Sequence, residues 1–206
     1  MASDVDICNL ALAHLGDEAT VASISPPEGS AQAGHCARFY PMARDSLLEM
    51  HPWSFTIRRE ALASVTLESA VSTWLYAYAV PADVLNLLGV YDPQSLSDWS
   101  DNSHYTPQEF VLETLSVGGQ ILLTNQAYAV LRYTRRITDP TKFSPLFVNT
   151  LAWLLASHLA GPLLKGDTGA AAAREAYKTF RSTFTDAVES DANQRRILPT
   201  RSEERR

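Results

Sequence analysis

The sequence predicts an α+β protein whose terminal helical segments pack as a bundle and carry a small, projecting antiparallel β-sheet. Apolar residues recur at helical spacing between Ser3 and Met50, and again after Ser144. From Ser54 to about Ile137 they alternate at a period of two, as in half-buried strands. These patterns predict a helical domain of residues 1–53 and 141–193 and a mainly β domain of residues 54–140.

The composition is typical of a globular chain with its own core. The 206 residues are 46% hydrophobic and 19% charged, and a chain of this size buries about 70% of its surface on folding. The net charge of -6 argues against general binding to nucleic-acid backbones. The small number of cysteines suits a reducing cytoplasm, and an acidic N-terminus predicts no export signal.

Two helices are predicted at the N-terminal end. Ser3 and Asp6 have the spacing of a capping box, and Gly16 is a typical helix stop. A second helix-rich segment covers Ala31 to Met50, where Pro41 is expected to kink or divide the helix because proline removes a hydrogen bond. The His-Pro-Trp sequence that follows ends it, since a residue before proline avoids the helical region.

The middle of the chain predicts strands joined by turns. A glycine pair at Gly118 and Gly119 between two apolar alternating runs is typical of a hairpin, and we expect one sheet. A long polar loop, Asp92 to Pro107, interrupts the pattern, and loops of this length are often functional. The predicted strands cover residues 74–80, 87–91, 110–115, 120–124 and 129–137.

Two further helices and a tail are predicted at the C-terminal end. Ser144 is a good N-cap for a helix to about Leu159, and Gly161-Pro162 marks the end of this helix or a kink in it. The uncharged stretch around this helix is long enough to span a bilayer, but its polar residues and prolines favour burial inside protein, so no membrane contact is predicted. A long helix follows from Thr168 to about Asn193. Residues 194–206 are rich in arginine and poor in apolar groups, which predicts a flexible tail.

Sequence motifs predict no enzyme, no cofactor and no metal. The chain has no nucleophile elbow, phosphate-binding glycine loop, dinucleotide fingerprint or His-Glu-x-x-His motif. Cys8, His14, His35 and Cys36 match no familiar zinc spacing, so we expect buried cysteines.

Two other classes of function stay open as alternatives. A small intracellular hydrolase would need His51 or His104 as a general base, and no partner for either is evident from spacing. A DNA-binding regulator would need a basic recognition helix, whereas the predicted helices are neutral or acidic.

Three stretches together resemble the head-to-tail connector family of tailed bacteriophages, which includes the tail tubular protein A type of gatekeeper adaptor. The most specific stretch runs from Cys36 to Leu62 and contains Arg44-Asp45 and His51-Pro52-Trp53. Residues 7–16 are similar to the opening helix of that family. The third stretch runs from Trp74 to Asp83 and resumes at Thr138-Asp139-Pro140. The resemblance covers nearly the whole chain in the expected order.

The resemblance implies a structural virion protein that is assembled in the host cytoplasm. It would form a ring of about twelve copies beneath the portal protein, join the DNA-filled head to a downstream tail or neck protein, and let DNA pass through its lumen without sequence-specific binding. A tail-completion or stopper protein of the same neck assembly is the alternative within this class.

Three sets of residues are the candidate contacts within this interpretation. A structural corner at the junction of helix and strand is expected from Arg44, Asp45, His51, Pro52 and Trp53. Contact with the portal is expected from the tail residues Arg195, Arg196, Ile197, Leu198, Pro199 and Arg201. Contact with a neighbouring subunit or the tail side is expected from Asp92, Asp98, Trp99, Asp101 and Tyr105 in the polar loop.

Overall fold

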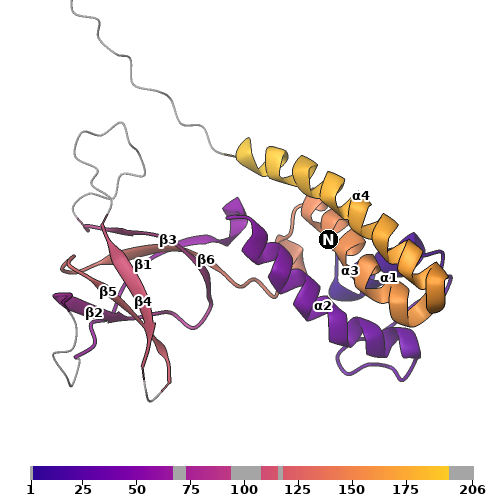
Figure 1. Cartoon of the computed structure of the whole chain (residues 1–206), viewed down its shortest axis with the longest axis horizontal. Coiled ribbons are helices and arrows are strands. Elements are labelled where there is room, and N and C mark those ends of the chain that lie inside the picture. Colours follow the sequence, from indigo (N-terminus) through magenta and orange to yellow (C-terminus); the bar gives the residue numbers. More distant parts are fainter. Residues whose placement is uncertain (1, 67–72, 94–107, 116–117, 195–206) are drawn as a thin grey trace, which may run out of the picture. The chain divides into compact units, whose positions relative to one another are not determined.

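The computed structural model describes residues 2–66, 73–93, 108–115 and 118–194 (Figure 1). Within these residues the chain has four α-helices and six strands, so the predicted α+β class is confirmed. The chain divides into two compact units. The helical unit extends up to Phe55 and resumes at Ile137, and the β unit lies between them, from Thr56 to Arg136.

The first helix, α1 (Asp4–His14), begins at the predicted capping box. The backbone N–H of Asp6 donates to Ser3 Oγ at 3.0 Å, and the Ser3 N–H donates to Asp6 Oδ2 at 2.9 Å. Hydrogen bonding of the Asp6 carboxyl to the backbone N–H and the side chain of Ser3 lowers the pKa of this carboxyl. The helix buries Ile7, Cys8 and Leu12, so its apolar side faces the core of the helical unit.

The second helix, α2 (Ala31–Met50), continues through Pro41 without being divided. Pro41 is exposed, while the buried residues Cys36, Tyr40 and Ala43 stand on both sides of it. The lost hydrogen bond is therefore outweighed by burial of an unbroken apolar face. The helix ends as predicted at His51, which has an extended backbone (φ -149°, ψ 142°).

The third and fourth helices, α3 (Pro145–Leu164) and α4 (Gly166–Ala192), follow each other directly. Ser144 caps α3 as predicted, and its Oγ accepts from the Phe147 N–H at 3.2 Å. The predicted end of α3 near Leu159 is wrong, because the helix continues through Pro162. It stops at Lys165 and Gly166, whose positive φ values of 56° and 53° break the helical path.

Helix α3 contacts all three other helices of its unit. It is also the helix, within the described part of the chain, that is long and apolar enough to cross a membrane by length and composition. Its buried residues include Phe147, Leu151, Leu155 and Leu159. Packing against α1, α2 and α4 accounts for the apolar composition of this helix.

The β unit has two three-stranded antiparallel sheets instead of the one sheet that the sequence predicts. The predicted hairpin is confirmed, since Thr114 pairs with Gln120 around two glycines with positive φ. The strand after the hairpin joins the other sheet. The sheet orders are β1-β6-β3 and β2-β5-β4, with β1 (Ile57–Ala61), β2 (Tyr76–Ala79), β3 (Val84–Tyr91), β4 (Phe110–Thr114), β5 (Gln120–Thr124) and β6 (Val130–Arg135).

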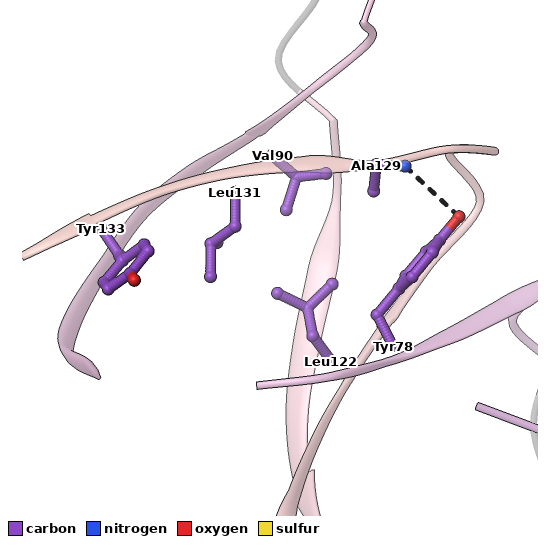
Figure 2. Close-up of a cluster of buried hydrophobic side chains, with 6 residues drawn as sticks. All are labelled: Tyr78, Val90, Leu122, Ala129, Leu131 and Tyr133. Atoms are coloured by element: carbon purple, nitrogen blue, oxygen red, sulfur yellow. Dashed lines mark hydrogen bonds between the residues drawn. The ribbon is translucent and has the colours of Figure 1, made fainter. Parts of the chain in front are cut away.

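One apolar cluster joins these two sheets (Figure 2). Tyr78 and Leu122 come from the β2-β5-β4 sheet, and Val90 and Leu131 come from the β1-β6-β3 sheet. The Tyr78 hydroxyl donates to the Gln126 carbonyl at 2.9 Å and lies 3.4 Å from the Ala129 N–H that donates to it. This side chain therefore fixes the short connection by which the chain changes from one sheet to the other.

Candidate functional site

The His-Pro-Trp sequence forms a corner, defined here as residues 51–54, at the end of α2, and Trp53 is its buried residue. Trp53 is 1% exposed, and its indole Nε1–H donates to the Leu47 carbonyl at 2.9 Å. Its ring lies edge-on to Phe147 of α3 at 5.0 Å and to Phe184 of α4 at 6.1 Å between centroids. Edge-to-face contacts of this kind add to the energy of burial, so the corner holds three helices together.

A carboxylate from the last turn of α4 completes this corner. Both oxygens of Asp191 accept from the Ser54 N–H, at 3.1 and 3.0 Å, and Oδ1 also accepts from the Ser54 hydroxyl at 2.7 Å. The His51 Nε2 atom lies 3.3 Å from Asp191 Oδ2. The side chains of His51 and Asp191 are only 22% and 11% exposed. We call this set of contacts the Asp191 clamp.

The position of Asp191 in its helix is electrostatically unfavourable. It lies in the last turn of α4, where the helix dipole favours cations and disfavours carboxylates. Hydrogen bonds to a charged group contribute about 1.5 to 3 kcal/mol each, which offsets this local cost. Sequence analysis missed Asp191 because Ser54 is 137 residues away. An acidic residue in the last turn of a long helix is the local signal that could have found it.

Arg44 and Asp45 lie earlier on α2. Arg44 Nε donates to Asp45 Oδ1 at 2.8 Å, and its Nη2 lies 2.8 Å from the same oxygen. The guanidinium stands over the Tyr40 ring, 5.9 Å from its centroid. Burial raises the pKa of the Tyr40 hydroxyl. This pair therefore lies within α2, and Asp191 is a charged group that contacts the corner.

The clamp does not have the geometry of a serine-hydrolase triad. In a triad the histidine stands between the serine and the carboxylate, so that it can take the serine proton. Here the Asp191 carboxylate stands between Ser54 and His51 and accepts from the Ser54 hydroxyl. The other histidine of the hydrolase hypothesis, His104, lies outside the described residues.

The metal-ligand residue types of the helical unit are dispersed or buried. Cys8 and Cys36 are both free and buried, as predicted. A hydrogen bond between the two thiols and burial raise the pKa of Cys8. His14 stacks on Trp153 with ring centroids 3.7 Å apart. Across the described residues, no group of three or more His, Cys, Asp or Glu side chains is placed to hold a metal ion.

Two of the predicted contact sets fall largely outside the described residues. All six tail residues do so: Arg195, Arg196, Ile197, Leu198, Pro199 and Arg201. In the polar loop, Asp98, Trp99, Asp101 and Tyr105 also lie outside them. Asp92 is described and directly follows β3.

No family model matches the sequence, and no curated protein matches it. A functional proposal therefore depends on the residues that form the corner, on the two-unit fold, and on the resemblance of the motifs described above.

Proposed function

We propose that this protein is a head-to-tail adaptor of a tailed bacteriophage particle. In this proposal it is a structural protein without catalytic activity, and about twelve copies form a ring beneath the portal. The observation that carries the proposal is the corner. The most specific resembling stretch contains a tryptophan, Trp53, that is buried among three helices. It lies three residues before Thr56, where the chain passes into the β unit. Such a motif has an architectural role.

The arrangement of the chain suits a ring-forming adaptor. In the proposal, the four helices act as a bundle that carries the β unit as a projection, and the bundles pack side by side. Conduction of DNA requires a lumen that does not hold the phosphate backbone, and a chain with a net charge of -6 meets this requirement. The ring would lie at the head-tail junction of the virion and would not contact a membrane.

The expected partners differ for the C-terminal segment and the polar loop. Residues 195–206 hold five arginines and two glutamates, whereas the chain as a whole is acidic. We assign this segment, including Arg195, Arg196 and Arg201, to the portal. The polar loop that begins at Asp92 is assigned to a neighbouring subunit or to the downstream tail or neck protein.

Light scattering and negative-stain imaging of the purified protein, alone and mixed with the portal ring of its own particle, test the proposal. We expect a monomer that forms a stacked ring on the portal. A stable monomer or dimer that ignores the portal contradicts the proposal. Binding to the downstream neck protein without binding to the portal would indicate a tail-completion or stopper protein instead.

Deletion of residues 195–206 tests the portal contact. The truncation begins after Gln194, since a deletion that started at or before residue 191 would also remove Asp191 and open the corner. We expect a folded monomer, with unchanged circular dichroism, that no longer joins the portal. Normal assembly of the truncated chain would contradict the assignment of the tail.

A further inference from the structure

We propose that Cys8 and Cys36 form a redox site at which a low-molecular-weight disulfide oxidises both thiols, so that a covalent bond ties α1 to α2. Both cysteines belong to the described residues. The chemistry of the site is independent of the proposed function. Its timing, with closure after a particle leaves the reducing cytoplasm, rests on that function.

The two cysteines face each other from different helices. Cys8 lies in α1 and Cys36 in α2, both are completely buried, and their thiols are joined by a hydrogen bond. A single buried cysteine packs as a small apolar group and needs no further explanation. Two thiols that point toward each other meet a main requirement of a disulfide, because the bond cannot form between side chains that point apart.

The hydrogen bond decides which thiol reacts first. The thiolate is the nucleophilic form of cysteine. The hydrogen bond with Cys8 lowers the pKa of Cys36, whereas the same hydrogen bond and burial raise the pKa of Cys8. Cys36 is therefore the attacking group, and Cys8 holds its proton until the second step.

The reaction balances with a small disulfide as the oxidant. The Cys36 thiolate attacks one sulfur of glutathione disulfide, which forms a mixed disulfide and releases one glutathione thiolate. Cys8 then loses its proton and attacks the Cys36 sulfur, which breaks the mixed disulfide and releases the second glutathione. The two cysteine thiols are oxidised, the reagent is reduced to two thiols, and both protons end on glutathione.

Burial sets the rate of the reaction and gives the bond its effect. Neither thiol reaches solvent in the folded chain, so exchange waits for local opening. Helix α1 has 11 residues, and a helix this short depends on packing for its stability. Its transient release exposes both thiols. Once formed, the bond returns α1 to α2 and closes the loop from residue 8 to residue 36, which reduces the freedom of the unfolded chain.

Oxidation of the natural chain with glutathione disulfide tests the site without any partner. The chain is incubated where circular dichroism shows full helix content, for long enough that the α1 amides exchange completely with deuterium in a parallel sample. Its mass is then measured after alkylation of free thiols. We expect a monomer that has lost two hydrogen atoms and takes up no alkylating group. A monomer that keeps glutathione, a disulfide-linked dimer, or two free thiols would each overturn the proposal.

Cys8→Ala and Cys36→Ala are the matched controls, because each leaves one thiol in place and cannot form the internal bond. Treatment with the same reagent should raise the thermal midpoint of the natural chain by about 5 to 10 °C and should not raise that of either variant. An unchanged or lower midpoint of the oxidised natural chain would show that the bond does not hold the two helices in their native arrangement, which also overturns the proposal.

The outcomes separate the redox site from the proposed function. The oxidation experiment uses the chain alone, so a failure to bind the portal does not affect its result. If the natural chain joins the portal and the two thiols do not form a bond, the adaptor proposal stands and the redox site is overturned.

Discussion

The helical unit and the β unit both use a buried aromatic side chain with a polar atom to control a change of chain direction. In the helical unit, Trp53 donates to the Leu47 carbonyl, six residues away, and its ring contacts distant helices. In the β unit, the Tyr78 ring packs among its neighbours, and its hydroxyl serves backbone groups about fifty residues away, at Gln126 and Ala129.

The difference reflects how each unit provides hydrogen-bond partners for its backbone N–H and C=O groups. Helices satisfy most of their own hydrogen bonds, so their buried aromatics contribute mainly by packing area. A connection between two sheets leaves backbone groups without ladder partners, so a side-chain hydroxyl has to supply them. Loss of a ring should therefore be most costly in the helical unit, and loss of a single hydroxyl should be measurable in the β unit.

The largest effect is expected for Trp53→Ala. Truncation of a fully packed tryptophan costs about 3 to 5 kcal/mol of unfolding free energy. Chemical denaturation followed by far-ultraviolet circular dichroism at helical wavelengths measures this loss. Met50→Ala, at a half-exposed site close by on α2, is the control and should change little. Unchanged stability of Trp53→Ala would show that the corner is not structural.

Gly169→Ala tests how closely the two long helices of the helical unit approach. A Cβ atom at this position would lie 3.0 Å from the Ala160 carbonyl oxygen and 3.4 Å from Gly161 Cα. We expect a loss of about 1 to 3 kcal/mol, since both obstacles are backbone.

Gly161→Ala is the matched control, because its Cβ would meet nothing within 4 Å and alanine favours helix. It should leave the unfolding free energy unchanged or raise it slightly. Equal effects of the two substitutions in thermal denaturation would show that Gly169 does not limit the distance between α3 and α4.

Tyr78→Phe isolates the hydroxyl of the β unit. The ring stays, but the Gln126 carbonyl and the Ala129 N–H lose a partner, which should cost about 1 to 3 kcal/mol. Hydrogen exchange of the Ala129 amide reports the change directly and should become faster. Tyr76→Phe, at an exposed site in the same strand, should leave both stability and exchange unchanged.

A pH dependence is expected in the helical unit. Burial lowers the pKa of His14 and of His158 in the folded protein. The unfolded chain therefore binds more protons below about pH 6.5, so stability is complete above that pH and falls as the pH drops through the folded-state values. The slope is at most about 1.4 kcal/mol per pH unit for each histidine. Denaturation from pH 7.5 to 5 should show a flatter profile for the double variant His14→Gln, His158→Gln, and an equally steep profile would contradict this assignment.

Local signals in the sequence predicted local structure well. Ser3 and Ser144 cap helices because their partners lie three residues ahead, and the two glycines of the hairpin supply the positive φ that the turn requires. The end of α3 was harder to predict. The cost of Pro162 inside the helix is opposed by the packing of α3 against its neighbours, which the sequence does not display.

Non-local pairings were beyond the sequence patterns. Alternation of apolar residues identifies the strands. It does not show that β6 pairs with β1 and β3 instead of joining the sheet that contains the β4–β5 hairpin. The same limit applies at the corner: His51 is visible in the motif, whereas Asp191, which contacts it, lies 140 residues further along the chain. The sequence thus predicted the part of the candidate site whose residues are contiguous in the chain, and it did not predict the part contributed by a distant residue.

Because the helical unit is discontinuous in sequence, its two parts leave the ribosome at different times. Ser54 leaves the ribosome 137 residues before the carboxylate that it binds, which at ordinary rates of translation is on the order of 10 s. During that interval the complete β unit emerges, whereas α1 and α2 still lack the partners that α3 and α4 supply. The apolar faces of the first two helices therefore stay uncovered until translation is almost finished. In a nascent chain of this kind, those faces are where chaperones would bind.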